Sequence, residues 1–412
     1  MESLAHKEVI NLLLQLAAML LSARVFAEIA QKFNQPAVVG EIIAGIVLGP
    51  TILGIITPDF FDYLFQSNPS ANLALDGIVQ MAVILLLFIA GLEVELHLVF
   101  SQGKSAINIS ILGLVFPFIL GFVIPYFFPT FFGLAEGNKL LFSLFMGTAM
   151  SITALPVVVR ILMDMDLFKT KMGMVIVAGA MVNDIIGWLI FSVILSFMGK
   201  SGNLSLISTI GITLLFTIFM LTLGKGLLNR VLPWINKKLA WPGGLLSLSI
   251  SFCFLLAAFT EWLGIHAIFG AFLFGVALGD SDHLSEKAKE IIHQFINNIF
   301  APLFFVSIGL KINFFTNFDF WLVAVIIVIS FLGKIVGSGY GALRSGYPLK
   351  EAMAVGFGMN ARGAMEIILG LIALENGLID EKLFVALVVM ALVTSMTSGP
   401  LMKWALRKKP AT

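Results

Sequence analysis

Charged side chains are scarce in this sequence: Asp, Glu, Lys and Arg make up 12% of its 412 residues, whereas 59% are hydrophobic. A soluble domain carries roughly 25% charged residues, so this chain has too few polar groups to cover a water-exposed surface. The charges nearly cancel, with 25 Lys and Arg against 24 Asp and Glu, which argues against a nucleic-acid partner. The mean hydropathy of +1.02 indicates a different partner, the lipid bilayer.

Cysteine is almost absent too, because Cys253 is the only one. A single thiol excludes an intramolecular disulfide and a thiolate metal cluster. The five histidines show no shared spacing typical of a metal site: His6, His97, His266, His283 and His293. We therefore expect no bound cofactor.

Apolar runs near the roughly 20 residues needed to cross a bilayer recur along the whole chain. We predict thirteen spans, at about residues 9–33, 36–54, 76–96, 105–128, 138–162, 171–198, 205–228, 243–262, 264–281, 289–310, 319–343, 349–375 and 382–405. We expect helices, because a helix satisfies its own backbone polar groups in lipid. The fold class is then all-α polytopic membrane protein, with residues 1–412 as a single membrane domain, and the first apolar run is a retained helix because it lacks a small-residue cleavage site.

Basic residues are distributed unevenly between the two sides of the predicted membrane. The loops on one side, with the C-terminal tail, hold most of them, among them Lys169, Lys171, Arg230, Lys237, Lys238, Arg344, Arg407, Lys408 and Lys409. The other side holds five: Lys7, Lys139, Lys200, Lys311 and Lys382. Because Lys and Arg are enriched in cytoplasmic loops, we expect the N-terminus outside and the C-terminus in the cytoplasm, which an odd number of spans allows.

The spans also show an internal symmetry. Residues 9–198 and 243–405 form two predicted repeats of six spans, and residues 205–228 connect them. The fifth span of each repeat is broken by small and polar residues, GTAMSITALPVVV in the first and GFGMNARGAMEII in the second. Two such repeats on either side of a single connecting span must be inverted, and paired broken helices indicate a transporter's binding site.

Asp184 and Asn183 lie near the middle of the span 171–198, in the run GAMVNDIIGWLI. A charge at that depth costs at least about 2.5 kcal/mol, so the carboxyl group must be neutral, paired or facing water. It can exchange a proton with a cation, or it can stay protonated as a hydrogen-bond donor to another helix. Neighbouring helix positions point about 100° apart, so Asn183 either lines the same site or holds a second helix.

Three further charges lie within the predicted spans. Arg362 and Glu366 are four residues apart and can pair, or Arg362 can stabilise loose helix ends where the span unwinds. A structural role is favoured for both. Lys334 lies midway through the span 319–343, too deep to be explained by a side chain that reaches the membrane surface.

Oxygen-bearing side chains near the breaks are candidate ligands of a hard monovalent cation. Thr153 lies inside the broken segment of its span, Ser151 lies just before it, and Asn360 lies in the second broken segment. Hydroxyl groups in helices often only bond back to the previous turn, and Thr153 alone stands above that alternative. Glu41, near the start of the span 36–54, either lines a vestibule or packs against another helix.

Five motifs, in order, resemble the monovalent cation:proton antiporter superfamily, specifically its CPA2 branch. They are QPAVVGEIIAGIVLGPTILG at 35–54, LLLFIAGLEVEL at 85–96, MSITALPVVVRIL at 150–162, VNDIIGW at 182–188 and GMNARGAMEIIL at 358–369. The third is similar to the broken helix of the fungal and plant cation/H⁺ exchangers and their bacterial relatives. The resemblance covers essentially the whole chain.

The resemblance implies the sodium/proton antiporter fold in a cell membrane such as the bacterial inner membrane, as a homodimer whose six-helix core carries two crossed, unwound helices and moves like an elevator. It implies that Asp184 alternately binds a proton or a monovalent cation and that Thr153, with water, completes the coordination. Many electrogenic relatives carry Asp where this chain has Asn183, and that acid pairs with a lysine matching Lys334. The Asn-Asp pair is typical of electroneutral members. The C-terminal nucleotide-binding domain of the potassium-efflux relatives is not expected here.

The sequence thus predicts a secondary antiporter that exchanges Na⁺ or K⁺ for H⁺, with one proton per cation, and serves cation and pH homeostasis. An electrogenic antiporter of the same family is one alternative, and a cation channel or transport-like sensor is another. An intramembrane enzyme would need a second acid beside Asp184, but Asp280 lies at a predicted helix end, too far away in depth to share a proton.

Overall fold

The computed structural model describes residues 6–33, 35–94, 96–134, 137–168, 170–198, 206–239 and 241–406. The basic residues Lys169, Lys200, Arg407, Lys408 and Lys409, used above for orientation, lie outside the described residues. Helices and short turns make up the described chain. The main helices are α1 (His6–Lys32), α2 (Ala37–Leu48), α5 (Pro69–Leu92), α6 (Leu96–Phe127), α7 (Lys139–Ser151), α8 (Leu155–Asp164), α9 (Lys171–Met198), α10 (Leu206–Phe219), the π-helical turn η3 (Met220–Gly224), α11 (Lys225–Lys238), α12 (Gly243–Trp262), α13 (Ala267–Gly279), α14 (Glu286–Lys311), α15 (Phe320–Arg344), α16 (Leu349–Met359), α17 (Ala364–Glu375) and α18 (Glu381–Leu406).

Ten helices in the described ranges are long and apolar enough to cross a membrane. The other three predicted spans coincide with the short helix α13 and with two interrupted pairs, α7–α8 and α16–α17. The predicted all-α class is confirmed, and each of the thirteen predicted spans coincides with a helix or a helix pair. The interrupted pairs occupy the fifth span of each predicted repeat; the division into inverted repeats stays a prediction.

Helix α5 begins at Pro69, seven residues before the predicted start of its span at 76. Its first turns carry polar side chains, so the apolar pattern did not reveal them. One of them, Asn72, is paired inside the protein: the amide nitrogen of Gln15 on α1 donates to the amide oxygen of Asn72 at 2.8 Å. Tertiary hydrogen bonding therefore extends this helix beyond its apolar part.

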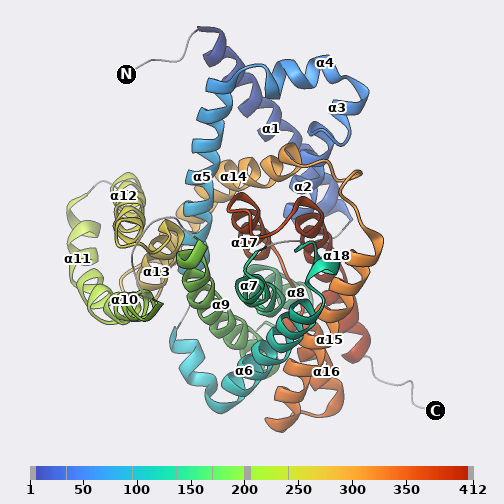
Figure 1. Ribbon diagram of the computed structural model, residues 1–412. Coiled ribbons are helices and arrows are strands. Elements are labelled where there is room, and N and C mark those ends of the chain that lie inside the picture. Colours follow the sequence, from blue (N-terminus) through green and yellow to red (C-terminus); the bar gives the residue numbers. More distant parts are fainter. Residues whose placement is uncertain are drawn as a thin grey trace.

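The helices form two groups that pack mainly within themselves. One group, here called the core, contains α6 to α9 and α15 to α18, and the other, here called the scaffold, contains α1, α2, α5 and α12 to α14. In the described part of the chain, contact between the groups is sparse and lies mainly between α9 and α13, while the connector α10–η3–α11 touches both of these helices. Figure 1 shows the core helices at the centre and lower right, α10 to α13 at the left, and α1 and α2 at the top.

Glycines allow the scaffold helices to pack backbone against backbone. A Cβ atom at Gly45 of α2 would lie 2.3 Å from the carbonyl oxygen of Val306 on α14. A Cβ atom at Gly91 of α5 would lie 2.1 Å from the carbonyl oxygen of Phe272 on α13. Small residues at helix crossings are typical of membrane bundles, where close van der Waals packing drives association. The scaffold is therefore a tightly fitted unit.

Candidate ion-binding site

The two interrupted helices of the core meet at their breaks. Helix α7 ends at Ser151, residues 152–154 are extended, and α8 begins at Leu155. Helix α16 ends at Met359 and α17 begins at Ala364. The breaks are joined by two hydrogen bonds, from the Ala154 amide to the Ala361 carbonyl at 2.9 Å and from the Thr153 hydroxyl to the Met359 carbonyl at 3.0 Å. This arrangement leaves helix ends, with their unpaired backbone groups, inside the protein.

Arg362 lies in the second break and supports the end of the first interrupted helix. Its guanidinium donates to the carbonyl oxygens of Ala149 and Met150, at the C-terminal end of α7, the former at 2.8 Å. It also pairs with Glu366, one turn into α17. The predicted pairing of Arg362 with Glu366 is therefore confirmed. The loose ends that Arg362 stabilises belong to α7 and not to its own helix.

Lys334 of α15 is fully buried and reaches the first break. Its ammonium donates to the Thr153 hydroxyl at 2.6 Å and to the Ser151 carbonyl. A third oxygen comes from Asn183, whose amide orientation is fixed because the Lys334 ammonium only donates and the Ser110 carbonyl only accepts. Asn183 then accepts from Lys334 at 3.0 Å and donates to the Ser110 carbonyl at 2.9 Å. All three donors of the lysine thus meet neutral oxygens.

Asp184 faces a different direction from Asn183, as expected for adjacent helix positions. Its side chain is fully buried, and neither carboxylate oxygen has a hydrogen-bond partner among the described residues. The charges of Lys334 and Glu93 act on the carboxylate, and so, more weakly, does the backbone amide of Leu155, the first residue of α8. A helix N-terminus favours negative charge nearby. The site therefore contains one buried carboxylate that no ion pair among the described residues neutralises.

The remaining predicted site residues differ in their surroundings. Asn360 is buried at the second break, and neither polar atom of its side chain has a partner, so it remains available as a ligand. The Ser151 hydroxyl donates back to the Thr148 carbonyl at 2.8 Å, as mid-helix hydroxyls often do. Glu41 of α2 is buried away from these residues, and one of its carboxylate oxygens has no partner.

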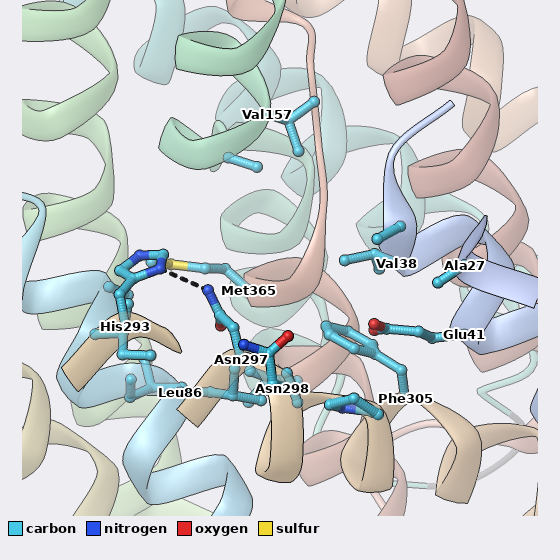
Figure 2. A pocket seen from close by; sticks show the side chains of 18 of the residues that line it. Ala27, Val38, Glu41, Leu86, Val157, His293, Asn297, Asn298, Phe305 and Met365 are labelled. Atoms are coloured by element: carbon cyan, nitrogen blue, oxygen red, sulfur yellow. Dashed lines mark hydrogen bonds between the residues drawn. The ribbon is translucent and has the colours of Figure 1, made fainter. Parts of the chain in front are cut away.

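Two cavities lie beside this site, along the boundary between scaffold and core. The first, here called the large cavity, has a volume of about 650 Å³ and is lined by Glu41 and residues of α1, α5 and α14, with Val157 and Met365 from the core. Figure 2 shows His293 and Glu41 on opposite sides of it, with Asn297 and Asn298 between them in this view. The Glu41 carboxylate points into the cavity, so this residue lines a vestibule.

The second, here called the small cavity, has a volume of about 400 Å³. It extends from the exposed residues Arg160 and Glu286 to Leu155, whose backbone amide acts on the Asp184 carboxylate, and to Met181, three residues before Asp184 on α9. Both cavities share Glu93 and His293 and lie toward the same face, the one predicted to be cytoplasmic. The cavities thus reach the residues that follow the first break, Ala154 and Leu155, from this face.

Three residues near the site were not singled out by the sequence pattern. Ser110 of α6 is a serine within an apolar run and belongs to none of the five motifs. Glu93 belongs to the motif LLLFIAGLEVEL without standing out in it, and His293 was named only among the five histidines that lack the spacing of a metal site. Their positions depend on contacts across 73 residues for Ser110 and 200 for Glu93 and His293. Nothing in the local sequence could signal such pairs.

Residues 17–408 match the family described as sodium/hydrogen exchanger, transmembrane. The chain belongs to this family. It is 33% identical over 385 residues to the Na⁺/H⁺ antiporter NhaS4 of Synechocystis, covering 92% of this chain and 93% of the relative. It is 28% identical to the Na⁺/H⁺-K⁺ antiporter GerN of Bacillus cereus, covering 96% of each chain. It is also 34% identical to cation/H⁺ antiporter 17 of Arabidopsis thaliana, where it covers 95% of this chain and 48% of that longer protein.

The fold is similar to that of the sodium/proton antiporter MjNhaP1 from Methanocaldococcus jannaschii at pH 8. The TM-score is 0.69, with 18% sequence identity, and the match covers 97% of this chain and 100% of the other. The predicted sodium/proton antiporter fold is therefore confirmed. The exchanger is a multi-pass cation/proton antiporter and not an enzyme, and the acid considered for an enzyme, Asp280, is instead paired with Lys225 at 2.7 Å.

Proposed function

We propose that the protein exchanges Na⁺ or K⁺ for H⁺ at one shared site, with Asp184 as the group that binds either ion. The observation that carries this proposal is the buried, partnerless carboxylate between two helix breaks. Either a proton or a cation neutralises it, and the empty, charged carrier crosses poorly because a buried charge is costly. Competition for one carboxylate therefore couples the two fluxes. The names of the relatives, Na⁺/H⁺ and Na⁺/H⁺-K⁺ antiporters, support these two cations.

The other cation ligands are proposed from the same two breaks. Asn360 has free polar atoms, and Thr153 keeps one acceptor lone pair after binding Lys334. Backbone carbonyls of the breaks and water would complete a shell of hard oxygens. Asn183 is proposed to act indirectly, because its amide is committed to Lys334 and Ser110.

We further propose that one proton is exchanged per cation. Asp184 is the one carboxylate of the site without a partner, and Asn183 supplies an uncharged oxygen to Lys334 where an acid would bring a second titrating group. If Lys334 stays an ammonium through the cycle, one positive charge moves in each direction. The electrogenic alternative requires Lys334 to lose its proton. The neutral amine would keep two N–H donors for the three oxygens that the ammonium now satisfies.

The movement is proposed to be that of the core against the scaffold. Sparse contact between the two groups and the tight packing within each support a rigid-body displacement. We also propose a homodimer, an outer N-terminus and a cytoplasmic C-terminus, on the basis of the family resemblance and the distribution of Lys and Arg.

The test of the shared site is the variant Asp184→Asn, measured as cation-dependent proton flux in proteoliposomes. We expect no exchange with Na⁺ or K⁺ at any pH, in a protein that still folds because the amide is uncharged and similar in size. Asp164→Asn is the matched control, since this acid is 55% exposed at the end of α8, and it should keep normal flux. Normal exchange by Asp184→Asn would refute the assignment.

A further inference from the structure

The outer side of α11, the last helix of the connector, carries exposed apolar and basic side chains in sequence. Leu227, Arg230, Trp234 and Lys237 follow one another at spacings of three or four residues, which places them on one side of the helix, and Lys238 lies beside them. All five are exposed. Figure 1 shows α11 at the left edge of the molecule, with α12 and α13 on its inner side. These five residues are here called the α11 patch.

The opposite side of α11 faces the scaffold. Leu232 and Ile235 are buried. The Lys225 ammonium pairs at 2.7 Å with Asp280, the residue that ends α13. This acid is therefore already paired and lies on the inner side of the helix. The patch is on the side that is turned away from the protein.

The basic side chains of the patch are not neutralised by the protein. Among the described residues, Arg230, Lys237 and Lys238 form no ion pair and no side-chain hydrogen bond. Asp282, an exposed acid after α13, lies 3.4 Å from the amide nitrogen of Asn229, which is also on the inner side of α11. The patch thus holds three positive charges that only the surroundings can balance.

The patch lies where the apolar stretch of the connector ends. This stretch covers Ile210–Ile235, and Lys237 and Lys238 lie just beyond it. Trp234 is 58% exposed at the boundary, and tryptophan is enriched at the depth where lipid headgroups begin. Arg230 lies about 7 Å before the end of the stretch, and a side chain of its length reaches the headgroups from there. Along the helix, apolar, aromatic and basic groups therefore follow the layers of a lipid monolayer.

We propose that the α11 patch is a binding site for an anionic phospholipid. The lipid phosphate accepts hydrogen bonds from Arg230, whose planar guanidinium matches two phosphate oxygens, and from Lys237 and Lys238. The acyl chains lie along Leu227, and the indole of Trp234 packs at the glycerol region. A zwitterionic headgroup also contains a phosphate, but its own ammonium is repelled by the three cations. The patch therefore selects lipids by net charge.

A second copy of the chain does not fit this surface. In a two-fold interface a surface faces its own copy, so the three cations of one chain would meet the three cations of the other, and like charges that face one another are unfavourable. An anionic lipid supplies the missing negative charge instead.

The position of the patch says which part of the protein the lipid would hold. The ion pair of Lys225 with Asp280 ties α11 to the scaffold, whereas the connector contacts the core through α10. The lipid would thus hold the scaffold end of the connector at the membrane surface. This inference goes beyond the proposed exchange and does not depend on it.

The test is native mass spectrometry of the purified protein in a mild detergent, titrated with phosphatidylglycerol or with phosphatidylcholine of the same acyl chains. Wild type should bind phosphatidylglycerol about tenfold or more tightly than phosphatidylcholine. The variant Arg230→Gln/Lys237→Gln/Lys238→Gln should hold at least one phosphatidylglycerol fewer per chain at a concentration that saturates wild type. Each single substitution should raise the Kd by up to about fivefold. The three side chains are exposed, so the variants should fold.

The matched control is Lys104→Gln/Lys171→Gln/Lys287→Gln, which removes three exposed lysines from α6, α9 and α14 and gives the same net charge. It should bind lipid as wild type does. Equal binding of the two lipids by wild type, or an unchanged lipid count in the patch variant, overturns the proposal.

Two further measurements separate the lipid from other partners. Glycerol phosphate lacks acyl chains and should not displace the lipid at equal concentration; displacement would assign the patch to free phosphates and overturn the proposal. Loss of a dimer in the patch variant alone would assign the patch to a second copy and overturn it too. Asp184→Asn should bind lipid as wild type does, so failure of the proposed exchange would appear separately, as normal flux by that variant.

Discussion

At the scale of single residues, Lys334 and Asn183 determine how many titrating charges the site contains. The lysine is satisfied by a carbonyl, a hydroxyl and an amide oxygen, so its charge is held by dipoles and not by an adjacent carboxylate. Asp184 and Glu366 act on it electrostatically from further away. The amide at position 183 is thus the residue on which the proposed stoichiometry depends.

The variant Asn183→Asp should convert the exchange to an electrogenic one. The new carboxylate would lie about where the amide oxygen now accepts from Lys334 at 3.0 Å and would form an ion pair that a second proton can break. We expect the flux, independent of voltage in wild type, to acquire a dependence of up to about 2.3 kcal/mol per 100 mV. The measurement is proton flux under imposed membrane potentials, with Na⁺ as the only transported cation present; Asn183→Ser is the uncharged control. An active but voltage-independent variant would contradict the role assigned to Asn183.

Arg362 should be required for stability more than for ion selectivity. The variant Arg362→Met leaves Glu366 as an unpaired buried charge and removes the donors from the end of α7. Breaking a buried pair costs about 3–5 kcal/mol, measured as a lower thermal unfolding midpoint in detergent.

The double variant Arg362→Met/Glu366→Met serves as the control for this prediction. It should recover part of the loss, since the buried charge is gone, but not the part that belongs to the α7 carbonyls. An Arg362→Met protein as stable as wild type would show that the pair does not hold the break.

At the scale of elements, the sequence predicted the helices better than their contacts. The breaks at Thr153 and Asn360 could be predicted because small and polar residues interrupt an apolar run. The pairing of Arg362 with Glu366 could be predicted because residues four apart can meet on one helix face. The early start of α5 could not be predicted from the apolar pattern, since Asn72 in its first turns is polar and finds its partner on α1. The partners of Lys334 could not be predicted, because a side chain's hydrogen bonds depend on which helices the fold brings together.

Close backbone contact between scaffold helices predicts an asymmetry between two glycines. Gly45→Ala places a methyl group 2.3 Å from the Val306 carbonyl and should destabilise the protein by about 1–3 kcal/mol. Gly77→Ala in α5 meets nothing within 4 Å and should be neutral or stabilising by up to about 1 kcal/mol. Thermal unfolding of the two variants provides the comparison, and equal effects would argue against tight packing of α2 on α14.

At the scale of the whole molecule, an ion pair joins core to scaffold on the face opposite the cavities. Lys311 at the end of α14 pairs with Glu375 at the end of α17 at 3.0 Å and with Asp76 of α5 at 3.2 Å. In this conformation the cavities are open toward one face and this link lies at the other. A core that moves past the scaffold must break it.

A covalent link at this position should stop transport. In a Cys253→Ala background, Lys311→Cys and Glu375→Cys together allow a flexible bis-maleimide to join α14 to α17, and we expect proton flux to fall to the background level. Each single cysteine treated with the same reagent is the control and should retain flux. Full activity of the cross-linked protein would exclude displacement of the core against the scaffold.

The central claim is that one carboxylate, Asp184, binds either one cation or one proton. Calorimetric titration of the purified protein with Na⁺ or K⁺, in buffers of different protonation enthalpy, counts the protons released for each cation bound. At a pH where the site is protonated, the account predicts about one proton per cation in wild type, and no cation binding in Asp184→Asn. Release of two protons, or cation binding without proton release, would contradict it.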